Sequence, residues 1–141
     1  MSFHTWSYTG IGFDVAEANN DAIFNFLKNH EQSIAEYLRD DIMAVVNDEE
    51  PDFGELLEVN DTCTISSIIA DIMSAETGIG FDYIGIGDDD EDAVMFLPCF
   101  PWEYSDKERA LTREEIVKTM TSYAQELCLR VDTDLTVEIS G

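Results

Sequence analysis

The sequence predicts a single α+β domain in which a largely antiparallel sheet packs with three or four helices. The chain has the length of one domain, 141 residues, and 45% of these are hydrophobic, enough to bury a core. Apolar residues recur at helical spacing in some windows and form short runs bounded by turn residues in others. The resulting order, β-α-α-α-β-β-α-β, is typical of an α+β domain. We therefore treat residues 1–141 as one acidic α+β domain.

Four stretches have the apolar spacing of helices. A short helix is expected to begin near Asn20 or Asp21, each of which is a good N-cap. The longer helices are expected at Gln32–Asn47, Thr64–Ser74 and Arg113–Leu129. Gly78 can end the second of these, and Thr112-Arg-Glu-Glu115 is a capping box that opens the third.

Four further stretches are predicted as strands. They are Phe3–Phe13, Ile79–Gly87, Ala93–Phe100 and the alternating segment Leu135–Ile139. The second and third flank an acidic turn and would form a hairpin. The hexapeptide Thr9–Asp14 recurs as Thr77–Asp82, which indicates either a duplicated strand start or two glycine-rich strands whose backbones lie close together.

The charge distribution is the most unusual property of the chain. The net charge is -24, and the 67 residues from Asp40 to Asp106 include 19 acidic residues and no Lys or Arg. Self-repulsion of this size opposes compactness, so we expect the chain to gain something from its field, most simply a strongly basic protein partner. The same charge should repel nucleic acid and anionic membrane surfaces.

Two acidic clusters are the predicted partner-binding sites. The first consists of Asp48, Glu49, Glu50, Asp52, Glu55, Glu58 and Asp61. The second, at the predicted hairpin tip, consists of Asp88, Asp89, Asp90, Glu91 and Asp92. If residues 52–59 are helical, Glu55 and Glu58 lie one turn apart on one face and could mimic a row of phosphates. The alternative is that each cluster is only a solvated surface.

No catalytic, metal or cofactor site is predicted, and we expect the protein not to be an enzyme. An EF-hand needs Gly at its sixth position and Glu at its twelfth, but counting from Asp88 these are Ala93 and Cys99. The Gly-Ile-Gly runs lack the third glycine and the parallel βαβ unit of a dinucleotide-binding fingerprint. His4 and His30 have no nucleophile or metal partner nearby in sequence and are interpreted as surface or structural residues.

Cysteine usage and hydropathy predict a cytoplasmic protein that does not enter the membrane. Cys63, Cys99 and Cys128 are odd in number, lack metal-ligand spacing and lie in apolar contexts, so we expect reduced, mostly buried thiols. No apolar run approaches 18 residues, and no charged-then-apolar segment opens the chain. Neither a transmembrane helix nor a signal peptide is therefore expected.

In composition and in its two acidic clusters, the chain resembles the phage-encoded acidic proteins that mimic DNA, which include anti-restriction and anti-CRISPR inhibitors. Immunity proteins for nuclease toxins are similar in charge. A net charge of -24 equals that of about 12 base pairs, or about 40 Å of duplex. A compact domain of this length should be roughly 35–40 Å across.

The resemblance covers no diagnostic motif and transfers no functional residue. It implies a stoichiometric inhibitor, of the anti-CRISPR type, in the host cytosol. Such an inhibitor would need no cofactor and would occupy the basic nucleic-acid channel of a host defence nuclease. The alternatives are a divalent-cation-binding or salt-adapted acidic domain and an immunity protein for a nuclease toxin. Salt adaptation is disfavoured by 13 Ile against 8 Val, which is unlike the lighter apolar side chains of salt-adapted proteins. The sequence does not predict an oligomeric state.

Overall fold

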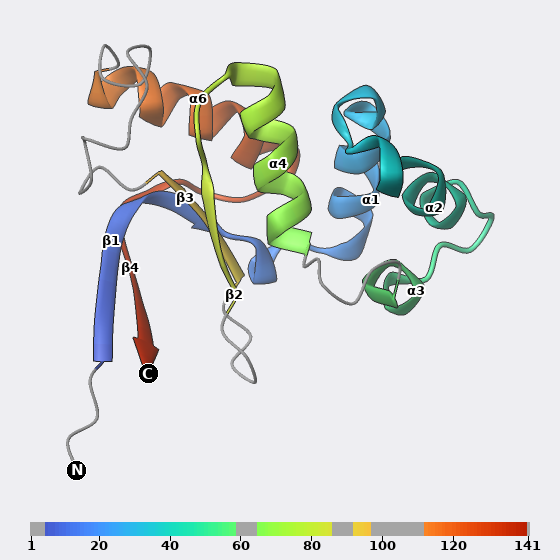
Figure 1. Cartoon of the computed structure of the whole chain (residues 1–141), viewed down its shortest axis with the longest axis horizontal. Helices are drawn as coiled ribbons and strands as arrows, with labels where there is room; N and C mark the ends of the chain where they lie inside the picture. The colour runs from blue at the N-terminus through green and yellow to red at the C-terminus, as the bar shows by residue number, and fades with distance from the viewer. Residues whose placement is uncertain (1–4, 59–64, 86–91, 97–111, 141) are drawn as a thin grey trace.

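A four-stranded antiparallel sheet and a set of helices make up the computed structural model, which describes residues 5–58, 65–85, 92–96 and 112–140 (Figure 1). The strands follow the spatial order β2-β3-β1-β4, and each neighbouring pair is antiparallel. Their bounds are Thr5–Asp14 for β1, Asp82–Gly85 for β2, Asp92–Phe96 for β3 and Asp132–Ser140 for β4. The predicted α+β class with a largely antiparallel sheet is confirmed.

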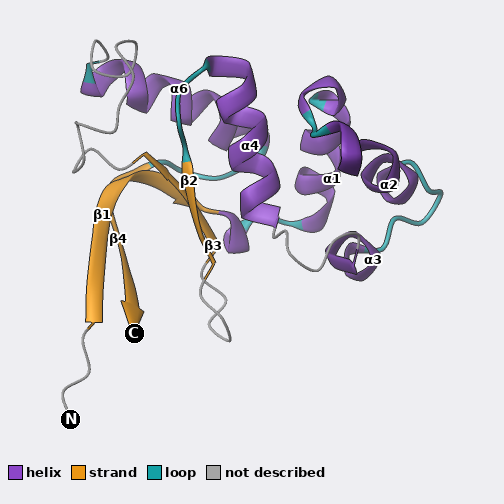
Figure 2. Cartoon of the chain, in the orientation of Figure 1, coloured by secondary structure: helices purple, strands orange, loops and turns teal. Residues whose placement is uncertain are grey.

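The described part of the chain contains five α-helices, one more than the largest number predicted. They are α1 (Asn20–Asn29), α2 (Glu36–Val46), α3 (Phe53–Glu58), α4 (Ile65–Thr77) and α6 (Arg113–Glu126), with two 3-10 turns, η1 (Val15–Glu17) and η2 (Glu31–Ser33). Helix α4 packs on β2 and β3, and α6 packs on β1. Helices α1, α2 and α3 lie beyond α4, at the end of the molecule away from the strands (Figure 2). None of the described helices is long and apolar enough to cross a lipid bilayer.

Local capping explains where the helices begin and end. The predicted capping box is present, because Thr112 Oγ1 accepts the Glu115 N–H at 3.2 Å and the Glu115 carboxylate accepts the Thr112 N–H at 3.2 Å. Gly78 ends α4 as predicted, with a φ of 72° that favours glycine. The predicted N-cap of α1 was wrong by one residue, since the Asn19 side chain accepts the Ala22 N–H at 2.8 Å.

The long helix predicted over Gln32–Asn47 begins later, at Glu36. The turn η2 occupies the first residues of that window, and extended backbone at Ile34 and Ala35 separates it from α2. This extended segment places Ile34 in the core, where it is buried. Leu38, Ile42 and Val46 are buried on one side of α2, but Tyr37 is exposed, and two local structures share the window instead of one helix.

The repeated hexapeptide adopts two different structures. Thr9–Asp14 lies within β1, where the register with β4 shifts between Gly10 and Gly12. Thr77–Asp82 runs from the last residue of α4 to the first residue of β2. The repeat therefore does not mark a duplicated strand start. The two backbones that lie close together are those of β1 and β3, because a Cβ on Gly12 would lie 2.3 Å from the Val94 carbonyl oxygen.

Helix α4 lies at the centre of the core. Its buried side chains extend around most of the helix and are Ile65, Ser66, Ser67, Ile68, Ile69, Ala70, Ile72 and Met73. Burial around most of the circumference is typical of a helix that other elements cover on more than one side. On the sheet side, the ring of Phe81 meets that of Phe96 edge-on, with centroids 6.3 Å apart. The same buried cluster continues into α1, α2 and α6.

The exposed thiol of Cys128 contradicts the expectation that the cysteines are mostly buried. Cys128 follows α6 with a φ of 58°, and its N–H donates to the Gln125 carbonyl at 3.1 Å. The Leu129 N–H donates to the Ala124 carbonyl at 2.9 Å, so these residues form a Schellman ending with Cys128 in the left-handed position. The reason for its exposure is that helix termination, and not the apolar neighbours, sets its direction. The other two cysteines lie outside the described residues.

Replacing Cys128 by glycine should stabilise the protein. The left-handed conformation costs a non-glycine residue about 1–2 kcal/mol, and the greater freedom of glycine in the unfolded chain offsets about 0.4–1 kcal/mol of that gain. We expect the free energy of unfolding in urea to rise by about 0.5–1 kcal/mol. Cys128→Ser, which keeps the Cβ, is the matched control and should leave stability nearly unchanged. Equal effects of the two substitutions would contradict the assignment.

Replacing Gly12 by alanine should destabilise the sheet. The added Cβ would meet the Val94 carbonyl at 2.3 Å, and because that oxygen belongs to the backbone of β3, the strands must move apart. Overpacking of this kind costs about 1–3 kcal/mol. Urea unfolding of Gly12→Ala should show a lower midpoint with a similar slope. An unchanged midpoint would mean that β1 and β3 do not approach so closely.

Candidate acidic interface

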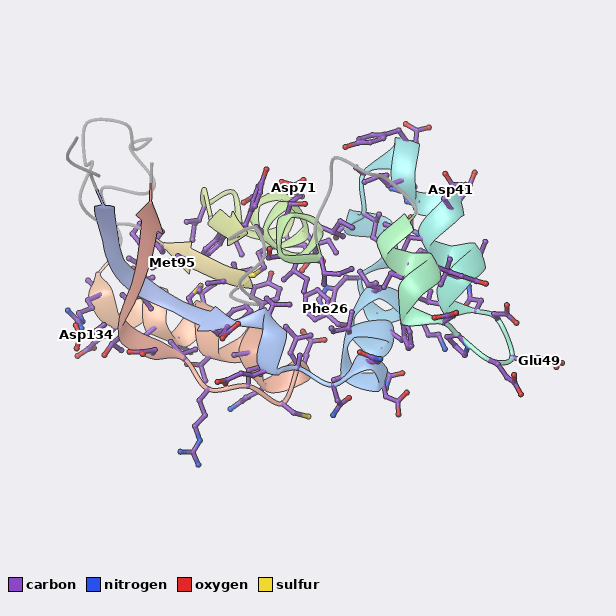
Figure 3. All side chains as sticks on the ribbon, turned by 90° about the horizontal axis from the view of Figure 1, so that it is seen from below. Phe26, Asp41, Glu49, Asp71, Met95 and Asp134 are labelled. Atoms are coloured by element: carbon purple, nitrogen blue, oxygen red, sulfur yellow. The ribbon has the colours of Figure 1, made fainter. Side chains whose placement is uncertain are left out.

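Exposed carboxylates gather on α2, on the loop after it and on α3. Eight acidic side chains between residues 36 and 55 are exposed, namely Glu36, Asp40, Asp41, Asp48, Glu49, Glu50, Asp52 and Glu55. Asp41 and Glu49 lie at the end of the molecule opposite the sheet (Figure 3). We call these eight residues the acidic face. It joins the described part of the first predicted cluster to three carboxylates of α2 that were not included in that cluster.

The helical period of α2 decides which of its residues are exposed. Leu38, Ile42 and Val46 recur every four residues and are buried. Relative to Ile42 in this stripe, Asp40 is rotated about the helix axis by about 160° and Asp41 by about 100°. Both side chains therefore leave the buried side and are exposed. Burial of the apolar stripe therefore holds the carboxylates outward, whatever their mutual repulsion.

Arg39 is the one basic residue of α2, and it does not neutralise the acidic face. Its guanidinium donates to the carbonyl oxygens of Gln32 at 3.1 Å and Ile34 at 3.0 Å. These bonds hold the turn before α2, where the backbone carbonyls have left helical pairing. Among the described residues, no ion pair joins the acidic face to a basic side chain. The face therefore keeps nearly all of its charge for solvent or for a partner.

Asp52 has a local structural role in addition to its charge. Its carboxylate accepts the Gly54 N–H at 2.8 Å, so it caps the start of α3. Leu56 is buried and anchors this short helix. The conditional prediction of a helix around residues 52–59 is confirmed by α3, which contains both Glu55 and Glu58. A test of partner binding should leave Asp52 in place, because its loss would also remove a cap.

The remaining predicted partner-binding residues are described only in part. Asp61, Asp88, Asp89, Asp90 and Glu91 lie outside the described residues. Asp92 is the first residue of β3 and pairs with Gly85 of β2, so the two strands predicted on either side of the acidic turn do form an antiparallel pair. The side chains of Glu58 and Asp92 are not described. The acidic face is therefore the part of the prediction that can be examined in detail.

A second charged site, which the sequence did not predict, lies where three helices end. The Nδ1 of His30 lies 2.8 Å from Glu76 Oε2, and its Nε2 lies 3.0 and 2.9 Å from the two carboxylate oxygens of Glu126. Ser33 Oγ donates to Glu76 Oε2 at 2.5 Å, and the Tyr123 hydroxyl donates to Glu76 Oε1 at 2.9 Å. We call these five residues the histidine junction.

The histidine junction favours a protonated imidazole and an ionised Glu76 carboxylate. Burial works to lower the pKa of His30, but hydrogen bonds to Glu76 and Glu126, together with their charges, outweigh it and raise that pKa above 6.5. Burial works to raise the pKa of Glu76, but hydrogen bonds from Ser33, His30 and Tyr123 outweigh it and lower the pKa below 4.5. Burial and the neighbouring carboxylate raise the pKa of Tyr123, so its hydroxyl stays protonated.

The geometry of the junction does not activate a nucleophile. Both ring nitrogens of His30 point to carboxylates, so the imidazole has no lone pair directed at the Ser33 hydroxyl, which donates to Glu76 instead. Sequence analysis interpreted His30 as a surface or structural residue, and these contacts show that it is a structural residue. His4 lies outside the described residues.

A weak signal in the sequence could have indicated the junction. Glu76 lies in the last turn of α4 and Glu126 is the last residue of α6, where the helix dipole disfavours negative charge. An acidic residue at such a position often needs a cation, and His30 was one of few available. The pairing itself could not be predicted, because the partners are 46 and 96 residues apart.

Comparisons with known proteins do not identify the chain. No protein-family model, curated protein or solved structure matches it. In the described part of the structure, no three His, Cys, Asp or Glu side chains converge in a way that could hold a metal ion. The acidic face is therefore the feature of the described structure from which we infer a function.

Moderate salt should stabilise the protein. Carboxylates without basic neighbours repel one another, and the Debye length falls from about 10 Å at 0.1 M to about 3 Å at 1 M ionic strength. We expect the thermal unfolding midpoint to rise steadily between 0.05 and 0.5 M NaCl. CaCl₂ at matched ionic strength should give a similar rise. A much larger increase with calcium would favour the divalent-cation-binding alternative.

Proposed function

We propose that this protein is a stoichiometric inhibitor that mimics nucleic acid and binds the basic nucleic-acid channel of a host defence nuclease, of the anti-CRISPR type. It would act in the cytosol by occupying the channel and would catalyse no reaction. The observation that carries the proposal is the acidic face, eight exposed carboxylates of which none is paired with a described basic side chain. A basic channel supplies the missing counter-charge.

The charge density of α2 supports mimicry of a nucleic-acid backbone. Glu36, Asp40 and Asp41 span about 7.5 Å of helix axis at a rise of about 1.5 Å per residue, so their mean axial spacing is about 3.75 Å. Duplex DNA carries one charge per about 1.7 Å, and one of its strands carries one per about 3.4 Å. The spacing on α2 is close to that of a single strand, so a channel built for phosphates would meet a comparable row of charges.

A fixed acidic face should also give fast association. Charges held outward by a packed helix do not have to be ordered at binding, and long-range attraction can raise association rates far above those of neutral partners. The rate should fall steeply with salt, because this steering is screened. Slow association that is insensitive to salt would be inconsistent with the proposal.

Charge reversal tests whether the acidic face binds such a partner. The target is first isolated by pull-down from host lysate with washes at stepped salt, and it is then assayed for competition with a labelled duplex. Asp48, Glu49 and Glu50 form no side-chain hydrogen bond or ion pair with the other described residues, so their joint replacement by Lys should leave the circular dichroism spectrum unchanged. We expect it to weaken competition at least about tenfold. A second variant replaces Asp88–Asp92 by Lys to test the other predicted cluster.

The matched control reverses three exposed carboxylates elsewhere, at Glu17, Asp21 and Glu114. It changes the net charge by the same amount as the triple substitution in the acidic face. Competition should fall clearly less in the control, because the lost charges are away from the proposed contact. Unaltered competition in both cluster variants, or equal losses in the cluster and control variants, would mean that these clusters are only a solvated surface.

A further inference from the structure

The histidine junction ties together three helix ends that are far apart in the sequence. His30 caps the C-terminus of α1, Glu76 lies in the last turn of α4, and Glu126 is the last residue of α6. The imidazole is largely buried, with its side chain 15% exposed, while those of Glu76 and Glu126 are 25% and 33% exposed. The junction is thus close enough to water to exchange protons, and buried enough for its charges to affect the stability of the packed helix ends.

We propose that His30 is a pH-sensitive latch, which in its protonated form holds the ends of α1, α4 and α6 together and on losing its proton releases α1 and η2 from the other two helices. The inference is independent of the proposed inhibitor function, because it depends on contacts within the fold. No residue of the acidic face takes part in the latch.

The contacts of the ring require two N–H groups. A neutral imidazole has one donor and one acceptor nitrogen, and only the imidazolium has two donors. Nδ1 and Nε2 each lie 2.8–3.0 Å from a carboxylate oxygen, and a carboxylate can only accept. With a neutral ring, one nitrogen lone pair would face one carboxylate at this distance. When both carboxylates are ionised, only the protonated ring can donate to each of them at once.

Among the described residues that face His30, no other cation could replace its charge. The facing groups are the Glu76 carboxylate from α4, the Glu126 carboxylate and Tyr123 hydroxyl from α6, the Ser33 hydroxyl from η2 and, within α1, the Phe26 ring at a centroid distance of 4.4 Å. Tyr123 remains neutral because its pKa is raised. Both carboxylates also lie at negative helix ends, so loss of the imidazolium leaves several uncompensated negative charges together.

The direction of the pH dependence follows from the two shifted groups. The pKa of His30 is raised by folding, so its contribution to stability is complete below about 6.5 and is lost as the pH rises through the higher native value. The pKa of Glu76 is lowered, so its contribution is present above 4.5 and is lost as the pH falls through the lower native value. The latch is therefore closed in mildly acidic solution and opens as the pH rises past the native His30 pKa.

Opening of the latch should loosen the end of α1 and η2 more than it loosens the sheet. The junction joins α1 and η2 to α4 and α6, and two residues of extended backbone connect η2 to α2. The sheet and its contacts with α4 do not involve His30. Release of the latch should therefore increase hydrogen exchange near residues 29–33 before it affects β1 or β3.

The experiment uses the full chain with His4→Gln, in which His30 is the single histidine and its ring protons can be assigned by NMR. The native His30 should titrate above 6.5, and Glu126→Gln should lower that midpoint. The folding equilibrium constant, measured in urea, should fall by at most about tenfold per pH unit between 6.5 and that midpoint. His30→Gln should lose this dependence, whereas His4→Gln alone should keep it.

The pH dependence of the folding equilibrium constant is compared between the native chain and His30→Gln. Their difference removes the contributions of the cysteines and the N-terminus, which titrate near the same range. If His30→Gln does not fold, the NMR titrations of the His4→Gln chain with and without Glu126→Gln still decide the question. A midpoint at or below 6.5, or equal pH dependence in the native and His30→Gln chains, would overturn the latch. Faster exchange at residues 29–33 above the midpoint, after correction for intrinsic rates, would support it.

Discussion

A net charge of -24 destabilises any compact state of this chain by self-repulsion, and the burial of apolar side chains around α4 outweighs this repulsion. Helix α4 lies between the sheet on one side and the remaining N-terminal helices on the other, so its burial joins the two parts of the molecule (Figure 1). Even so, α4 carries Asp71 at its surface, where partial burial raises the pKa of the carboxyl. Negative charge therefore lies next to the core, at Asp71, as well as on the exposed acidic face.

Basic groups are so few that the positions of those described are informative. Arg39 binds backbone carbonyls, and His30 contacts two carboxylates at once. Arg113 lies 3.8 Å from Asp134, but both side chains are exposed, and such pairs contribute little. The two best-placed cations are therefore used inside the structure, at a turn and at a helix junction. This placement leaves the acidic face without neutralisation, which would be a disadvantage in a protein that had no basic partner.

The acidic face and the histidine junction deal with negative charge in opposite ways. On the face, carboxylates are separated by helical geometry and extend into water, where repulsion is weakened by solvent and salt. At the junction, two carboxylates are brought within reach of one imidazole and depend on its proton. The first arrangement leaves charge exposed, where we propose that a basic partner binds, while the second is the one that we propose couples the packing of three helices to pH. Both follow from the same scarcity of Lys and Arg.

Local patterns in the sequence determined much of the fold. Helical spacing, the Thr112 capping box and Gly78 predicted α2, α4 and α6, because caps and apolar stripes act over a few residues. The same stripe of α2 also explains which of its carboxylates face solvent. Cys128 was misjudged because its apolar neighbours said nothing about the left-handed helix ending that turns its side chain outward.

Only the tertiary structure decided which distant groups meet. No local pattern could show that Arg39 turns to carbonyls, that Gly12 lies against Val94, or that His30 joins Glu76 to Glu126. These contacts depend on how whole helices and strands pack. That packing is set by burial summed over the entire core, whereas a sequence window reports only the few residues within it.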